Sequence, residues 1–185
     1  MTKTLTKIAA VLILLSFGAS VFYYYAPQPV FAPASPISDF QDKRDTQDLL
    51  KIFETDRYWL ISSEDYDPAH ALSTRSPNKR DSRYFGKLQI KVLRENDKLI
   101  GFVAYYMKNF FIGQLLFLAV KPEFRGKGYA QKLMQYALDD MKKQGASIIT
   151  LVTRTSNLGA QAVYKKLGFT VTYEEDGFVY FELRV

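Results

Sequence analysis

The stretch Val120-Lys-Pro-Glu-Phe-Arg-Gly-Lys-Gly-Tyr-Ala130 decides the fold of this chain. It begins at the last residue of the apolar run Leu115–Val120 and ends where an amphipathic helix begins. A strand that leads through a glycine-rich turn into a helix predicts an anion-binding site, because free backbone N–H groups and the positive end of the helix dipole point the same way. Gly126 and Gly128 lack a Cβ, so a phosphate can approach the backbone closely. Arg125 and Lys127 add positive charge beside it.

Apolar periodicity on both sides of this turn predicts a mixed α/β sheet. The strand, helix and strand around the turn are long enough to form a parallel pair with a right-handed crossover, whereas the other strands follow short turns and pair antiparallel. The expected elements are a helix at 39–59, a short helix at 69–74, strands at 88–92, 99–107 and 114–120, a helix from Ala130 to Met141, a strand at 147–153, a helix at 157–167, and a closing hairpin of 169–173 with 178–184. The fold class is therefore α/β, with the order βββαβαββ after an N-terminal helical region and one parallel strand pair.

The N-terminal segment predicts a membrane association. Residues 8–26 form a 19-residue run without a charge, preceded by Lys3 and Lys7. As a helix this run would span about 28 Å, close to the thickness of the hydrocarbon core of a bilayer. We interpret residues 1–26 as an uncleaved anchor; the alternative is a signal peptide that is removed from a secreted protein. Residues 27–36 hold four of the seven prolines and predict a semi-rigid spacer, which leaves residues 37–185 as the folded domain.

The two N-terminal lysines also bear on the orientation in the membrane. Cations before an apolar run predict that the N-terminus stays inside and that the domain lies outside. Whether the domain lies outside also depends on where its substrates are found, so its side of the membrane stays open at this point.

The composition excludes several classes of site. The chain has no cysteine and a single histidine, His70, so thiolate chemistry and a histidine-rich metal centre are not expected. We predict no metal. The net charge of +6 is a mild excess, which indicates a mixed-charge surface and not a nucleic-acid-binding domain.

With these residues placed, the chain resembles the GNAT superfamily of acyl-CoA-dependent N-acyltransferases. Arg125, Gly128 and Ala130 match the pyrophosphate signature of that family. The block from Asn157 to Phe169 is similar to its Asn…Ala…Tyr…Gly-Phe helix. The resemblance covers residues 37–185. It implies that the domain transfers an acetyl group from acetyl-CoA, as a co-substrate, to a primary amine on a small molecule, peptide or protein.

The resemblance also implies a role for particular residues. The backbone of the strand before the turn would bind the pantetheine arm, and the N–H of Leu118 would donate to the thioester carbonyl. Tyr164 would protonate the departing thiolate; the alternative is a core aromatic. Asn157 would contact the coenzyme, cap its helix, or do both. The coenzyme-binding residues implied in this way are Leu118, Ala119, Val120, Arg125, Gly126, Lys127, Gly128, Tyr129, Ala130 and Asn157, and the catalytic ones are Tyr164 and Leu118.

The general base is the main departure from the family pattern. The two positions where family members often carry a glutamate are Gln114 and Val152 here, and neither side chain is a base. Asp65, Asp67 and His70 lie in the polar loop expected to border the acceptor, but each is better interpreted as a solvated loop residue. An acceptor with a low pKa, such as an α-amine near 7.7–8.0, or a relay through water would need no strong base. The missing carboxylates also make a non-catalytic acyl-CoA-binding or sensing module the alternative to an enzyme.

Overall fold

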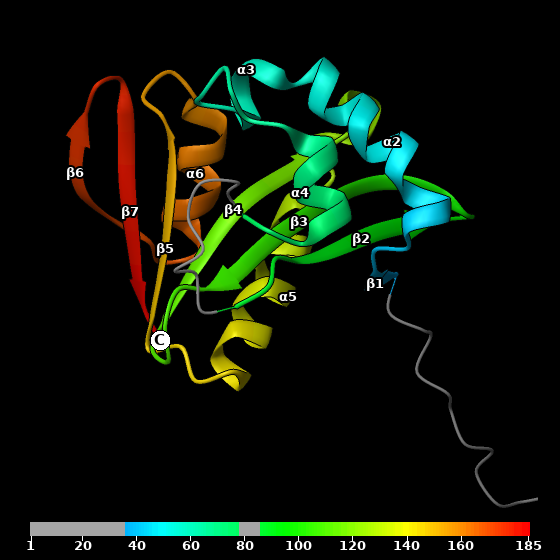
Figure 1. Ribbon diagram of the computed structural model, residues 1–185. Coiled ribbons are helices and arrows are strands. Elements are labelled where there is room, and N and C mark those ends of the chain that lie inside the picture. The colour runs from blue at the N-terminus through cyan, green and yellow to red at the C-terminus, as the bar shows by residue number, and fades with distance from the viewer. Residues whose placement is uncertain (1–35, 78–85) are drawn as a thin grey trace, which may run out of the picture. The chain divides into compact units, whose positions relative to one another are not determined.

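A seven-stranded sheet forms the centre of the domain. The computed structural model describes residues 36–77 and 86–185 (Figure 1). The strands lie in the order β1-β2-β3-β4-β5-β7-β6, and every neighbouring pair is antiparallel except β4 and β5. Their bounds are β1 Ile37–Asp39, β2 Gln89–Glu95, β3 Lys98–Met107, β4 Ile112–Val120, β5 Ile148–Arg154, β6 Thr170–Glu175 and β7 Phe178–Arg184.

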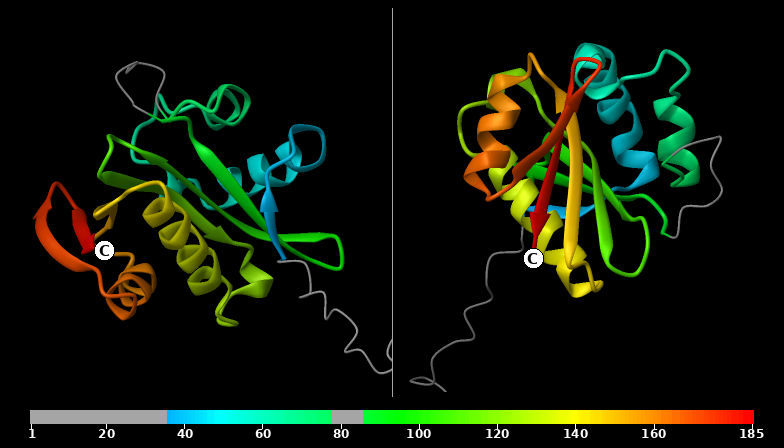
Figure 2. Two further views of the ribbon diagram at one scale, coloured as in Figure 1. Left: turned by 90° about the horizontal axis from the view of Figure 1, so that it is seen from below. Right: turned by 90° about the vertical axis from the view of Figure 1, so that its left-hand side faces the viewer.

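Helices cover both faces of this sheet, as Figure 2 shows. One face carries α2 (Asp42–Thr55), α3 (Arg57–Leu60) and α4 (Pro68–Thr74), and the other carries α5 (Tyr129–Lys143) and α6 (Leu158–Lys166). Each face has its own hydrophobic core. Alternate residues of β3 serve the two cores: Phe102 packs toward α2, and Val103 packs toward α5. This is the period-2 geometry of a strand buried on both sides.

The parallel pair is short. Its register is Ile112↔Ile148, Gly113↔Ile149 and Gln114↔Thr150, and no pairing follows although both strands continue. A β-bulge explains part of this divergence, because Leu115 and Phe117 pair with consecutive residues of β3 and leave Leu116 unmatched. Bulges bend the strand that carries them and increase its twist. The last six residues of β4 therefore line one wall of a gap in the sheet.

The structure confirms the predicted order of strands and helices after the N-terminal region, and it confirms the single parallel pair. The prediction of one helix at 39–59 is wrong. Residues Ile37–Asp39 form β1, and the helix is broken at Asp56, where the backbone leaves the helical region between α2 and α3. Asp56 is 8% exposed and forms an ion pair with Arg125, so a contact far along the chain fixes this break.

The predicted anchor at 8–26 lies outside the described residues, as does nearly all of the spacer at 27–36. Within 36–77 and 86–185, no helix has the length and apolar character needed to cross a bilayer.

Candidate active site

The glycine turn leaves backbone donors available at the start of α5. A short 3-10 helix, η1 (Pro122–Phe124), precedes the turn, and Gly126 and Gly128 adopt φ of 78° and 80°. A Cβ built on either glycine meets no atom within 4 Å, so the space over the turn is open. The bond from Lys132 N to Gly128 O, 3.1 Å long, belongs to the first turn of the helix. The N–H groups of residues 129–131 precede it and remain free for a ligand. Open space and free donors fit a diphosphate.

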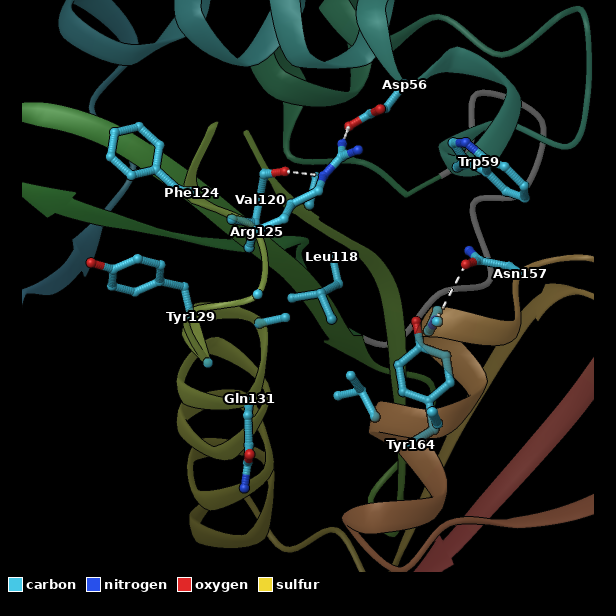
Figure 3. A pocket seen from close by; sticks show the side chains of 18 of the residues that line it. Asp56, Trp59, Leu118, Val120, Phe124, Arg125, Tyr129, Gln131, Asn157 and Tyr164 are labelled. Atoms are coloured by element: carbon cyan, nitrogen blue, oxygen red, sulfur yellow. Dashed lines mark hydrogen bonds and ion pairs between the residues drawn. The ribbon is translucent and has the colours of Figure 1, made fainter. Parts of the chain in front are cut away.

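A cavity of about 750 Å³ extends from this turn along the gap in the sheet (Figure 3). Tyr164 and Asn157 lie on one side of it, whereas Arg125 and Tyr129 lie on the other. The cavity brings together all but one of the predicted site residues: Leu118, Ala119, Val120, Arg125, Gly126, Gly128, Tyr129, Ala130, Asn157 and Tyr164. The remaining one, Lys127, does not line it, and its Nζ lies 5.4 Å from the centroid of the Phe124 ring.

The backbone of β4 offers a donor in the gap. Lys121 N donates to Ile100 O of the neighbouring chain segment at 2.8 Å, and Val120 is paired with Gly101. In an antiparallel ladder the direction of the backbone groups alternates, so Ala119 bonds toward β3 and Leu118 turns its N–H toward β5. None of the described strands pairs with Leu118 on that side. Its N–H is therefore exposed in the gap, as an oxyanion donor must be.

Arg125 is held in place by two contacts. Its Nη2 lies 2.5 Å from Asp56 Oδ2, and its Nε donates to Val120 O at 2.9 Å. The guanidinium thus joins the end of β4 to the break between α2 and α3. Its charge is shared with Asp56, which also lines the cavity. The backbone N–H groups of the turn, and not the arginine alone, therefore supply much of the attraction for an anion.

Tyr164 is a buried phenol that borders the cavity. Its ring packs against Phe169 and Phe181, with centroid distances of 6.1 and 5.7 Å. The hydroxyl makes no hydrogen bond to the described residues, and burial raises the pKa of Tyr164 to about 12. The phenol is consequently protonated at neutral pH and has a proton to donate.

Asn157 is the N-cap of α6. Its Oδ1 accepts a hydrogen bond from Ala160 N at 3.3 Å, which confirms the capping alternative. The Nδ2 group donates no hydrogen bond to the described residues. It lines the cavity and is free to contact a ligand, so both roles proposed for Asn157 are compatible.

A second cavity of about 360 Å³ adjoins the first, because Trp59 and Leu60 line both. Gln114 and Val152 line this second cavity. Gln114 is 7% exposed; it donates to Leu115 O at 2.9 Å and accepts from Thr150 Oγ1 at 2.9 Å. Gln114 therefore links β4 to β5 where the two strands part, and its carboxamide is not a base.

The acidic residues of the polar loop lie elsewhere. Asp67 accepts from His70 N at 3.1 Å and caps α4. Neither cavity is lined by Asp65, Asp67 or His70. Within the described ranges, no group of three or more histidine, aspartate or glutamate residues could hold a metal ion.

The sequence did not predict the positions of Asp56, Trp59 and Arg154, which border the two cavities. Trp59 and Asp56 were placed inside a single helix, which concealed their position at the cavity. Arg154 lines the second cavity at the end of β5. No local pattern marks these residues, since their contacts join segments far apart in the chain.

The parted parallel pair, the glycine turn at a helix N-terminus and the cavity that joins them form a site for a long ligand that carries a diphosphate. The chain belongs to the acetyltransferase (GNAT) family, whose model matches residues 46–169. The resemblance drawn from the two sequence motifs is thereby confirmed.

Two curated relatives are similar in sequence. N-alpha-acetyltransferase 30 of Schizosaccharomyces pombe is 39% identical over 82 residues, which cover 42% of this chain and 55% of that protein. A Bacillus subtilis protein with the provisional name ribosomal protein bS18-alanine N-acetyltransferase is 31% identical over 113 residues, covering 57% of this chain and 74% of that protein. The chain thus spans about half the length of the first relative and three quarters of the second.

Solved structures share the fold. The ribosomal-protein-S18-alanine N-acetyltransferase of Escherichia coli has a TM-score of 0.60 at 20% identity and covers 80% of this chain and 92% of its own. The PaiA N-acetyltransferase of Thermoplasma acidophilum, solved in complex with coenzyme A, has a TM-score of 0.63 at 22% identity and covers 80% and 98%. At these identities the likeness extends to the fold.

Proposed function

We propose that the protein is an N-acetyltransferase that transfers an acetyl group from acetyl-CoA to a primary amine by direct attack in a ternary complex. The observation that carries this proposal is the gap between β4 and β5. It presents an unpaired N–H at Leu118 between two adjoining cavities, one ending at the glycine turn and the other open to a second substrate. Membership of the acetyltransferase family supports the same reaction.

Acetyl-CoA fits the larger cavity in one direction. Its diphosphate takes the N–H groups at the start of α5, and its pantetheine arm runs along the unpaired edge of β4. The thioester then lies near the Leu118 N–H, and the sulfur lies toward α6, where Tyr164 borders the cavity. Two relatives solved with coenzyme A or acetyl-CoA bound are consistent with such a co-substrate.

The chain's own groups account for each step of the transfer. A neutral amine attacks the thioester carbon, and the developing oxyanion accepts a hydrogen bond from the N–H of Leu118. The carbon–sulfur bond then breaks, and the hydroxyl of Tyr164 donates to the departing sulfur. The pKa of Tyr164, about 12, lies well above that of an ordinary thiol, so the phenol holds its proton more tightly than the thiolate would. Tyr164 therefore stabilises the departing sulfur through the hydrogen bond, and its proton is not fully transferred before the carbon–sulfur bond breaks. The proton lost by the amine nitrogen balances the one gained by the thiol.

The acceptor is an amine with a low pKa. Among residues 36–77 and 86–185, no carboxylate or histidine lines the second cavity, so these residues supply no strong base there. An α-amine, with a pKa near 7.7–8.0, has a useful neutral fraction at pH 7, whereas a lysine amine near 10.4 has almost none. One relative is named as an N-alpha-acetyltransferase and another as an alanine N-acetyltransferase, which supports this choice.

Thiol release by the full-length protein tests the reaction. We expect release of coenzyme A from acetyl-CoA when peptides with a free N-terminus are added, and much slower release with the same peptides when only a lysine side chain is free. Tight binding of acetyl-CoA without thiol release for any amine would favour a sensing module instead.

We further propose that residues 8–26 attach the domain to a membrane, since this run is uncharged and long enough to span one. Lys3 and Lys7 before it favour an external domain, whereas the need for acetyl-CoA favours an internal one. Protease protection of the 37–185 region in sealed vesicles measures the orientation. Recovery of the protein in the soluble fraction, without its first residues, would indicate a cleaved signal instead.

A further inference from the structure

The second cavity differs sharply from the first in its charges. We propose that it binds an α-amine that carries a carboxylate a few bonds away, and that Arg154 recognises this carboxylate; the inference rests on the proposed transferase function. Among the described residues that line this cavity, Arg154 is the one with a full charge at neutral pH. Its other walls are mainly aromatic or aliphatic, namely Trp59, Leu60, Ile61, Tyr66, Leu115, Leu116, Phe117, Val152, Phe178 and Tyr180.

The guanidinium of Arg154 is rigidly oriented. Its Nε donates to Tyr58 O at 2.7 Å, and its Nη2 donates to Ile61 O at 3.2 Å. It also lies between two rings, 4.2 Å from the centroid of Tyr58 and 5.0 Å from that of Phe178. These contacts fix the plane of the group, so little side-chain entropy is lost when it binds a partner.

The described residues supply no anion to balance this charge. Among residues 36–77 and 86–185, no carboxylate lies within ion-pair distance of Arg154, and its Nη1 donates no hydrogen bond. The first cavity, in which we place the coenzyme and which we call the coenzyme cavity, differs in this respect, since its Arg125 is paired with Asp56. A half-buried cation that binds only neutral carbonyls attracts an anionic partner more strongly than an exposed, paired one does.

The register of the strands places Arg154 opposite the reaction centre. The last paired residues of the parallel seam are Gln114 and Thr150. Leu118 lies four residues beyond Gln114 on β4, and Arg154 lies four residues beyond Thr150 on β5. Arg154 is therefore about 13 Å beyond the last pair along β5. Leu118 is somewhat less far along β4, because the bulge at Leu116 shortens the rise, and the two residues lie on the diverging strands that border the gap. An amine that reaches the thioester near Leu118 keeps the rest of its molecule close to Arg154.

This charge also selects against other amines. A second ammonium group on the acceptor would lose water in an apolar cavity and would face a cation of the same sign, which is unfavourable twice. Polyamines and lysine-rich N-termini are thus disfavoured. The recognised chemistry has two sources: an acidic side chain beside the N-terminus of a peptide, or the carboxylate of a free amino acid.

The test uses three peptides that differ only in their second residue, which is glutamate, glutamine or lysine, together with alanine and alaninamide. We expect kcat/KM of the full-length protein for thiol release to be about tenfold higher for the glutamate peptide than for the lysine peptide, with a preference that weakens as salt is raised. Alanine against alaninamide shows whether a free carboxylate serves as well; these two are compared by their binding to the protein, because their amines differ in pKa and hence in the fraction ready to react. Equal kcat/KM for all three peptides, together with no tighter binding of alanine than of alaninamide, overturns the proposal.

Substitution of Arg154 shows whether this residue recognises the carboxylate of the acceptor or only holds the segment from Tyr58 to Ile61 in place. Arg154→Gln should bring the glutamate-to-lysine ratio to within about threefold, whereas Arg154→Lys should keep part of it. Arg57→Gln removes the same charge from exposed α3, where Arg57 binds Glu64 O and lines neither cavity, so its ratio should not change. If Arg154→Gln lowers kcat/KM equally for all peptides and leaves the glutamate-to-lysine ratio unchanged, Arg154 has only a structural role and the proposal is wrong.

Binding provides a readout that does not depend on turnover or on a folded variant. Trp59 is the only tryptophan of the chain and lines both cavities, so its fluorescence should respond to peptides added to the wild-type protein saturated with coenzyme A. Tighter binding of the glutamate peptide supports the inference even if no peptide is acetylated, an outcome that would refute only the proposed reaction. Equal binding of the glutamate and lysine peptides overturns the inference even if both are acetylated.

Discussion

Replacing Tyr164 by phenylalanine removes one oxygen and leaves the buried ring in place. The hydroxyl has no hydrogen bond to the described residues, and the contacts with Phe169 and Phe181 belong to the ring. The free energy of unfolding should therefore change by less than about 0.5 kcal/mol near neutral pH. The departing sulfur, in contrast, loses its donor, and kcat should fall at least about 100-fold, as expected for loss of a positioned acid.

Tyr105 offers a matched control for this experiment. It is also a buried tyrosine, but its hydroxyl donates to Asp140 Oδ2 at 2.7 Å and it lines neither cavity. Tyr105→Phe should lower stability by about 1.5–3 kcal/mol, because a hydrogen bond to a charged group is lost, and should leave kcat unchanged. Chemical denaturation gives the stabilities, and thiol release at saturating acetyl-CoA and peptide gives kcat. An unchanged kcat in Tyr164→Phe, measured with chemistry rate-limiting, would refute the role assigned to the phenol.

The raised pKa of Tyr164 adds a dependence on pH. The folded value of about 12 lies above the usual 10.0, so the neutral phenol is favoured in the folded state. The neutral phenol of Tyr164 contributes fully to stability below pH 10. As the pH rises from 10 to 12 this contribution is lost, and the free energy of unfolding falls by about 2–3 kcal/mol. Tyr164→Phe should lack this part of the alkaline loss of stability. The raised pKa of Tyr105 acts in the same direction and should persist in that variant.

Three further substitutions address the coenzyme cavity. Gly128→Ala places a side chain at φ 80° and fills the space over the turn, so the affinity for acetyl-CoA, measured by calorimetry, should fall by tenfold or more. Arg125→Gln leaves the buried Asp56 unpaired and should lower the free energy of unfolding by about 1–2 kcal/mol. Adding Asp56→Asn to this variant should largely restore the stability, whereas additive losses in the double variant would argue against the pairing. Asn157→Ala removes a helix cap worth about 1 kcal/mol, and it should also raise KM for acetyl-CoA if the free Nδ2 group contacts the coenzyme; a loss of stability alone would limit Asn157 to capping.

Local patterns made most of the fold predictable. The apolar stripe of α5, the alternation in β2 and the turns between the later strands depend on neighbours within a few residues, and each appeared near its expected bounds. Strand β1 did not, because its three residues are largely exposed and have no periodicity of their own. It exists through pairing with β2, more than fifty residues away.

The site divides in the same way. The glycine turn and the helix of Tyr164 have sequence motifs, so the residues of the first cavity that belong to these motifs were predicted, whereas Asp56 and Trp59 were not. The second cavity, in contrast, forms through contacts between distant segments. Arg154, for example, donates to the carbonyls of Tyr58 and Ile61, which are 96 and 93 residues away along the chain. A guanidinium bound to carbonyl groups leaves no signature in a sequence, because every residue has a carbonyl.

The parallel seam of three residue pairs has a mechanical consequence. It joins the part of the sheet formed by β1 to β4 to the part formed by β5 to β7, so it is the natural hinge of the sheet. A coenzyme that touches both the edge of β4 and helix α6 would act as a staple across that hinge. Amide hydrogens of residues 148–150 should then exchange with solvent more slowly once the coenzyme is bound, although no atom of it needs to touch them.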